Sequence, residues 1–292
     1  MSALQKRENR WGYLFILPNF IGFALFTMVP IIIAFIFSLS NYDVVSRFTF
    51  IGLENYFKLL QDRIFIKSLT NTLYYSLLTV PAGIVLSFLT AVLLNRKMRG
   101  IKIVRTFLFI PVITSSVAVS LVWSMLYEEH AGLLNIFLKA IGLKPVGWLT
   151  DPSIAMISVA IVSIWKNLGY NMTIYLAGLQ GVPNELYEAA TIDGAGKWQK
   201  LLHITVPMLH PTTYFVALTA LIRSFQEFDM VNIMTEGGPI NSTITVAMYL
   251  YNYGFKYFEM GYACAAAYVL FLLVFVVSLV QNHISDKMDR VS

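Results

Sequence analysis

The chain has 292 residues, of which 57% are hydrophobic and 13% are charged. Soluble domains average about a quarter charged residues, so this composition excludes an ordinary soluble domain and predicts an integral membrane protein. The net charge of +5 is better explained by basic loops at a cytoplasmic membrane surface than by nucleic-acid binding. The single cysteine, Cys264, excludes an internal disulfide, and no Cys/His cluster has the spacing of a zinc site.

The first apolar stretch follows Lys6, Arg7 and Arg10, an arrangement that also begins a cleavable signal peptide. However, the uncharged run from Trp11 to Tyr42 is much longer than the apolar core of such a peptide, which has about 7–15 residues. We therefore expect a retained first transmembrane helix.

A helix that crosses a bilayer needs roughly 20 mostly apolar residues, and six segments meet this requirement. In chain order they are Tyr13–Leu39, Thr72–Leu94, Thr106–Tyr127, Ile154–Leu176, Pro211–Phe228 and Gly261–Val280. The sequence thus predicts an all-α integral membrane protein with six transmembrane helices in a single domain, residues 1–292.

The distribution of Lys and Arg predicts the orientation. Six spans place both termini on the same side of the membrane, and that side carries 12 of these residues against seven in the opposite loops. The bias is strongest in the loop after the second segment, which contains Arg96, Lys97, Arg99, Lys102 and Arg105. Because basic loops stay in the cytoplasm, we expect both termini there.

The polar segment 182–207, between the fourth and fifth spans, is expected to form two short helices that meet at a turn. Asn184 opens the first helix, and Glu185 and Glu188 lie in its early turns, where the helix dipole favours acids. Asp193-Gly194 stops this helix, because glycine accepts the left-handed conformation common at helix C-termini.

A second short helix is expected from about Lys197 to Thr205, with Pro207 ending it. Trp198, Leu201 and Leu202 give this helix an apolar face. Spacing alone leaves open an ordinary amphipathic connector that lies on the membrane.

Two of the predicted spans carry polar residues, which are candidates for function because they are costly in lipid. Asn167, Tyr170 and Asn171 follow i, i+3, i+4 spacing and share one helix face. In the fifth span, Arg223 and Glu227 are spaced i, i+4. The alternative is structural: Lys166 or Arg223 pairs with Glu227 or reaches the membrane interface, and Asp229 caps a helix end.

The segment 182–207 resembles the cytoplasmic EAA loop of ABC importer permeases. It matches the family pattern at Glu188, Ala189, Ala190, Gly194, Ile204 and Pro207, and Asp193 and Ala195 fit the common Asp-Gly-Ala form, while Val206 stands where Leu is usual. In that family the loop docks on an ATPase subunit. The resemblance therefore implies an ATPase-coupling role for Glu188, Ala189, Ala190, Asp193, Gly194 and Ala195.

Three further motifs extend the resemblance to nearly the whole chain. They are Gly52-Leu53-Glu54-Asn55-Tyr56, Asn71-Thr72, and Gly237-Gly238-Pro239 with Thr243. All three are similar to the maltose-transporter-type sugar permeases. The resemblance implies the ABC importer type I permease fold and the first of two permease subunits, in importers for oligosaccharides, other glycosides or glycerol-3-phosphate.

The resemblance also implies partners and a location. The partners are a second homologous permease, two ATPase subunits and an extracytoplasmic solute-binding protein, and the location is the prokaryotic plasma (inner) membrane. Gly194-Ala195-Gly196-Lys197 is not a phosphate-binding loop, because Thr191 and Trp198 stand where Gly and Ser/Thr are required. We therefore expect no enzyme activity and no cofactor in this chain, with ATP and Mg²⁺ bound by the partner ATPase.

Alignment with the maltose-type permease gives candidate residues for the substrate path. Its sugar-contacting positions fall on Lys166, Asn167, Tyr170, Arg223, Ser224 and Glu227. Apart from Tyr170, most residue types differ from that permease. A tyrosine suits a sugar, because its ring stacks on an apolar sugar face while its hydroxyl forms a hydrogen bond.

The charges on these two spans do not decide whether the solute is anionic or neutral. Two cations and one acid favour an anionic solute if all three face the path, whereas an Arg223–Glu227 pair leaves a neutral sugar equally open. An ion-coupled secondary carrier that uses Lys166, Arg223 and Glu227 is the alternative function. A membrane-embedded enzyme is disfavoured, because no metal motif, nucleophile elbow or catalytic carboxylate pair is found.

Overall fold

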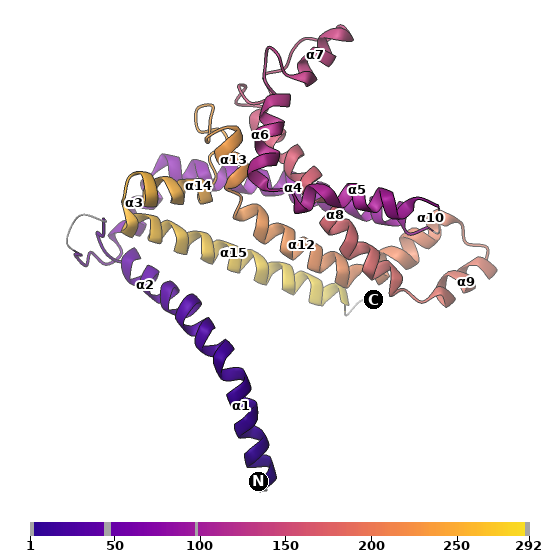
Figure 1. Ribbon diagram of the computed structural model, residues 1–292, viewed down its shortest axis with the longest axis horizontal. Coiled ribbons are helices and arrows are strands. Elements are labelled where there is room, and N and C mark those ends of the chain that lie inside the picture. The colour runs from indigo at the N-terminus through magenta and orange to yellow at the C-terminus, as the bar shows by residue number, and fades with distance from the viewer. Residues whose placement is uncertain (1–2, 44–47, 97–98, 290–292) are drawn as a thin grey trace. The chain divides into compact units, whose positions relative to one another are not determined.

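The structure is a computed structural model that describes residues 3–43, 48–96 and 99–289 (Figure 1). Side chains are described for residues 11–43, 48–96, 99–283 and 285. Lys97 and the side chains of Lys6, Arg7 and Arg10, which entered the orientation argument, lie outside these ranges. Nearly all regular structure in the described part is helical, and a bridge joins Ser40 to Phe50.

The chain divides into two compact units. The first comprises Met1–Asp62 and Leu250–Val269, and the second comprises Arg63–Tyr249 and Leu270–Ser292. The last helix, α15 (Met260–Asp289), contributes to both. The single domain expected over residues 1–292 stays a prediction.

The first unit begins with one long helical run. It consists of α1 (Ala3–Phe23), the π-helical turn η1 (Ala24–Met28) and α2 (Val29–Ser38). The apolar part, Trp11–Ser38, is 28 residues long and exposes nearly all of its side chains. This agrees with a first transmembrane helix.

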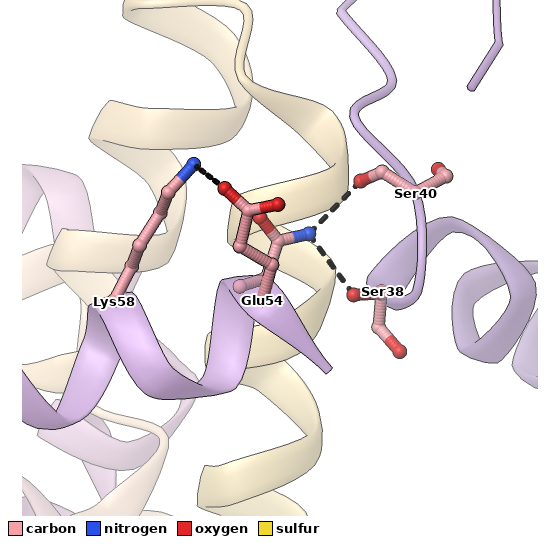
Figure 2. Close-up of polar contacts among 5 residues, drawn as sticks. Ser38, Ser40, Glu54 and Lys58 are labelled. Atoms are coloured by element: carbon pink, nitrogen blue, oxygen red, sulfur yellow. Dashed lines mark hydrogen bonds and ion pairs between the residues drawn. The ribbon is translucent and has the colours of Figure 1, made fainter. Parts of the chain in front are cut away.

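Asn55 holds the short helix α3 (Glu54–Gln61) against the end of α2. The side chain is 4% exposed, and its Nδ2 donates to the carbonyl oxygens of Ser38 at 3.0 Å and Ser40 at 2.9 Å. Figure 2 shows these two bonds and the exposed ion pair between Glu54 and Lys58, 2.9 Å long. The carbonyls at a helix C-terminus lack helical partners, so this motif residue supplies the missing donors.

The second unit contains the remaining helices. They are α4 (Arg63–Leu94), α5 (Ile101–Ile113), α6 (Ser116–Leu126), α7 (Leu133–Ala140), α8 (Ala155–Gln180), α9 (Asn184–Ile192), α10 (Lys197–Lys200), η2 (Leu201–Thr205), α11 (Val206–Met208), α12 (His210–Phe225), α13 (Asp229–Met234) and α14 (Val246–Tyr251), which runs into η3 (Asn252–Lys256) of the first unit. Helix α8 packs on α4 and α5, and α12 packs on α4 and α8 (Figure 1).

Small and polar residues form the face of α4 that is buried in this packing. They recur every three to four residues: Ser68, Thr72, Ser76, Thr79, Gly83, Ser87 and Ala91. Lipid tails are as apolar as leucine, so helices in a bilayer associate through close contact between small residues. Glycines give α8 the same closeness: a Cβ at Gly169 would collide with the Leu108 carbonyl of α5, and one at Gly178 would lie 2.5 Å from Thr212 Oγ1 of α12.

The motifs that lie far apart in the sequence meet in this unit. The Asn71 amide donates to the carbonyls of Asn241 at 2.9 Å and Ile244 at 3.0 Å, and Thr72 Oγ1 accepts from the Val246 amide at 3.0 Å. Thr243 in turn donates to the Gly238 carbonyl at 2.8 Å. The Asn-Thr and Gly-Gly-Pro motifs therefore fix one loop onto α4.

The single helix expected over Thr106–Tyr127 is wrong. Helix α5 ends at Ile113, α6 begins at Ser116, and their axes differ by 99°. Two features explain the break. Pro111 removes a backbone donor from the last turn of α5, and the Thr114 hydroxyl bonds to the Ile110 carbonyl at 2.9 Å, which competes with continued helix.

Three described helices are long and apolar enough to cross a membrane alone: Trp11–Ser38, Arg63–Leu94 and Met260–His283. The bent pairs α5–α6 and Lys197–Met208 with α12 raise this number to five. Helix α8 has 26 residues, about 39 Å at 1.5 Å per residue, and is thus long enough to span a bilayer. Its polar residues make it less apolar than the helices named above. The six spans and the cytoplasmic termini stay predictions.

Replacing Asn55 by Asp tests the contact between α2 and α3. The substitution keeps the side-chain size but removes both amide donors. It should therefore lower the free energy of unfolding by about 1–3 kcal/mol. Lys58→Ala, which breaks an exposed ion pair, should lower the free energy of unfolding by less than about 1 kcal/mol. The measurement is the apparent melting temperature of the purified protein in detergent, and equal shifts for the two variants would contradict the role of Asn55.

Cysteine labelling tests the orientation in a Cys264→Ala background. A membrane-impermeant maleimide added to intact cells should label Lys144→Cys and should leave Lys197→Cys unlabelled until the membrane is opened. A cytoplasm-specific reporter fused after Ser292 should be active. The reverse labelling pattern would place the termini outside.

Candidate functional site

The polar face predicted on α8 converges on one residue of α12. The guanidinium of Arg223 lies 4.7 Å from the centre of the Tyr170 ring, a distance typical of a cation–π contact. It also donates from Nη1 to Asn167 Oδ1 at 3.4 Å and from Nη2 to Asn171 Oδ1 at 3.2 Å. The shared face of Asn167, Tyr170 and Asn171 is confirmed.

The ion pair between Arg223 and Glu227, which the sequence left open as a structural alternative, is not formed. Their i, i+4 spacing would bring them together only on a continuous helix, but α12 ends at Phe225. The Glu227 carboxylate instead accepts from the Met230 amide at 3.0 Å and from the Tyr75 hydroxyl at 3.3 Å. It therefore caps the start of α13, the task that the sequence had suggested for Asp229.

Ser224 and Lys166 differ in their surroundings. Ser224 is 5% exposed, and its hydroxyl lies 2.9 Å from the Ser76 hydroxyl of α4 and 2.8 Å from the Leu221 carbonyl. It therefore serves the packing of α12 on α4. Lys166 is also buried, and it lines a hollow together with Glu227 and Asp229.

Two hollows adjoin Arg223. One lies between α4, α8 and α12 and encloses about 40 Å³, which is room for a few waters. The other, about 280 Å³, reaches Ser116 at the start of α6 and the start of α13. Asn167, Arg223 and Glu227 line both hollows. These three residues thus form the wall between them.

The sequence analysis missed the contribution of α4 to the first hollow. Tyr75, Thr79 and Gly83 of α4 line it, as does Asn171 of α8. The recurrence of small and polar residues along α4 at helical spacing was the available signal. This signal is weak on its own, because small and hydroxyl side chains occur at many helix–helix contacts in membranes.

The turn expected at Asp193-Gly194 is confirmed. Gly194 has a φ of +78°, which glycine adopts without strain. Its amide donates to the Thr191 carbonyl at 3.1 Å, and the Ala195 amide donates to the Ala190 carbonyl at 2.8 Å. This pair of bonds is the Schellman motif that ends many helices.

The second helix of the loop continues further than expected. The chain passes from α10 through the π-helical turn η2 into α11, and Pro207 lies inside α11 rather than ending it. The Val206 amide donates to the Leu201 carbonyl, and this wider turn accommodates the proline ring. The helix then bends by 65° before α12.

Both ends of the segment 182–207 are fixed in the helix core. Val182 at its start and Leu209 just after it belong to one buried cluster, which also contains Tyr175 of α8 and Val216 of α12. The segment is therefore anchored by packing on both α8 and α12.

The outer face of this segment is uncovered by the described chain and carries two exposed large apolar side chains among polar ones. Ile192 is 87% exposed and Trp198 is 73% exposed. Ala190 and Ala195 line a groove of about 320 Å³ beside them, and Glu188, Ala189, Asp193 and Gly194 are exposed. An exposed apolar patch of this kind is typical of a protein interface.

The comparison with known proteins places this chain. A family model described as "Binding-protein-dependent transport system inner membrane component" matches residues 83–290. The chain belongs to this family. The matched range contains the loop 182–207 and all six polar candidates.

Relatives match over nearly their full length. The lactose transport system permease protein LacF of Rhizobium radiobacter is 36% identical over 97% of this chain and 96% of its own. The arabinooligosaccharides transport system permease protein AraP of Bacillus subtilis is 36% identical over 94% and 88%. A crystal structure of a bacterial alginate ABC transporter, in complex with an alginate pentasaccharide-bound periplasmic protein, aligns with a TM-score of 0.87 and 26% identity over 99% of this chain and 98% of the other.

The family and the all-α ABC importer permease fold expected from the sequence are therefore confirmed. As a member of this family, the chain is a membrane component of a transport system, and it contains several apolar helices. The roles of individual residues stay predictions.

Two substitutions at Tyr170 test the contact with Arg223. Tyr170→Ala removes the ring below the guanidinium and should weaken transport roughly two- to tenfold, the equivalent of a cation–π contact. Tyr170→Phe keeps the ring and should have a smaller effect. Transport by the assembled complex is the measurement, with basal ATP hydrolysis as the assembly control. Equal losses in both variants would assign the effect to the hydroxyl instead.

Proposed function

We propose that this chain is a permease subunit of an ATP-driven ABC importer that moves a sugar or oligosaccharide across the prokaryotic inner membrane. The observation that carries the proposal is the segment 182–207: Ile192 and Trp198 are exposed on its outer face, and both of its ends are packed among the helices that bear the polar path. The names of the relatives, which include lactose and arabinooligosaccharide permeases, support the sugar class.

The complete transporter would contain further subunits. A second homologous permease completes the membrane part, and two ATPase subunits bind ATP and Mg²⁺. An extracytoplasmic solute-binding protein delivers the sugar. This chain contributes passage and coupling, and its residues take no part in the chemistry of ATP hydrolysis.

The coupling would be mechanical. An ATPase subunit that closes on ATP pushes on the segment 182–207, which contacts it through Ile192 and Trp198 and through the EAA-like residues. Because Val182 and Leu209 are packed in one cluster, the push moves α8 and α12 as rigid bodies. The contacts of Arg223 with Asn167 and Asn171 cross between these two helices, so they change when the access of the path changes.

The sugar would pass Lys166, Asn167, Tyr170, Arg223 and Glu227. Tyr170 offers a ring for stacking, and Asn167 offers an amide for hydrogen bonds to hydroxyl groups. Ser224 acts by holding α12 on α4.

An ion-coupled secondary carrier is the second candidate, because Lys166 and Glu227 line one hollow and are groups that such carriers use for coupling. The exposed segment 182–207 distinguishes the two functions. A secondary carrier has no partner for this surface, whereas an ATP-driven importer depends on it.

Substitution of Gly194 tests the proposal. Gly194→Pro removes the amide that bonds to Thr191 and forbids a φ of +78°, so transport and solute-stimulated ATP hydrolysis should both be lost while the chain still inserts. Gly194→Asn should retain most activity, because asparagine tolerates this conformation. Normal uptake by a well-expressed Gly194→Pro complex would exclude the coupling role.

A further inference from the structure

The charge of Arg223 is held by neutral groups. Its guanidinium contacts the Tyr170 ring, the side-chain oxygens of Asn167 and Asn171, and, through Nε at 3.2 Å, the Thr219 carbonyl. No acidic side chain among the described residues forms an ion pair with it within 4.0 Å. A half-buried cation without a counter-ion is costly in a membrane protein.

The nearest acids on these elements are already engaged elsewhere. Both oxygens of Glu227 accept hydrogen bonds, from Tyr75 and from Met230. Asp229 is exposed at the start of α13 and lines the larger hollow with Lys166 and Glu227. Both acids thus line the larger hollow with Lys166 and Arg223 alike, but among the described residues neither forms an ion pair with Arg223.

The guanidinium retains donors for a ligand. It has five N–H groups, and three of them are used by Thr219, Asn167 and Asn171. One N–H remains on each of Nη1 and Nη2 beside those that serve Asn167 and Asn171. The bonds to Asn167 and Asn171, at 3.4 and 3.2 Å, are long, so they are readily exchanged for stronger, charge-assisted bonds.

We propose that Arg223 binds a carboxylate of the transported solute, and that this solute is an acidic saccharide of the uronate type. The inference deepens the proposed function and depends on it. The Tyr170 ring lies 4.7 Å from the guanidinium and favours the position from which Arg223 meets the carboxylate. A neutral sugar would leave the charge of Arg223 uncompensated.

The position of Arg223 gives this contact a consequence for transport. Arg223 lies in the wall common to both hollows, so a solute that moves from one to the other passes the guanidinium. Binding of the carboxylate replaces the bonds to Asn167 and Asn171, which link α12 to α8. An acidic saccharide would thus loosen the link that closes the path, and a neutral one would do so less well.

The test compares solutes of equal length delivered by the same binding protein. The complete transporter is reconstituted in proteoliposomes with trigalacturonate, or with its carboxyl-reduced neutral counterpart, and stimulated ATP hydrolysis and uptake are measured. Wild type should prefer the acidic compound, and Arg223→Gln should reduce this preference about 10- to 100-fold, the value of a hydrogen-bonded charge. Arg223→Lys should retain part of it, and Lys144→Gln, an exposed residue outside the path, should leave it unchanged.

The outcomes separate this inference from the proposed function. Stimulation by the neutral compound alone would overturn the acidic class and leave a sugar importer. An acidic preference that survives Arg223→Gln would overturn the role of Arg223. Normal basal ATP hydrolysis without stimulation by either compound, or by any other saccharide tested, would contradict the sugar class itself.

Discussion

The close approach of α8 to its neighbours is the constraint on which the rest of the second unit depends. In a bilayer, burial of apolar side chains between helices gains little over contact with lipid, so the helices must fit closely. Gly169 allows α5 to approach α8, and Gly178 allows α12 to approach it. The small residues of α4 pack against α8 on its remaining side. This fit fixes the direction of α8, whose middle bears Asn167, Tyr170 and Asn171 and whose end leads into the segment 182–207.

The polar path follows from where the helices end. Non-helical backbone is tolerated at membrane depth only where protein or water satisfies it. The interruption after Phe225 releases Glu227 from α12 and turns its carboxylate toward the amide of Met230 and the hydroxyl of Tyr75. Without this interruption Glu227 would neutralise Arg223, and the path would lose the charge that we assign to solute binding.

Local patterns were predicted well from the sequence. The Schellman turn at Gly194 requires a left-handed residue, and Asp-Gly at the end of a helical segment marks such a turn. The shared face of Asn167, Tyr170 and Asn171 depends only on helical periodicity, which α8 obeys throughout.

Features that depend on helix ends and on distant partners could not be predicted. Thr106–Tyr127 is uncharged and long enough for one span, and its 99° bend depends on Pro111 and on the hydrogen bond of Thr114 to Ile110, which hydropathy does not register. The partners of Glu227 lie on α4 and α13, so the i, i+4 spacing pointed to the wrong partner, Arg223. Ser224 lines the first hollow while its hydroxyl bonds to Ser76, a packing contact that the sequence did not predict, and its place in the path stays a prediction. The hydrogen bond from Asn71 to the Asn241 carbonyl joins residues that are 170 positions apart in the sequence. No local pattern predicts such a contact.

The central claim is that ATP hydrolysis by a partner drives passage through this chain by way of the segment 182–207. The most direct measurement is uptake of labelled saccharide into proteoliposomes that contain either the complete complex or this chain with its permease partner alone. The account predicts uptake only when the ATPase subunits, ATP and the loaded binding protein are all present. Uptake without ATPase subunits, driven by a proton or sodium gradient, would contradict it.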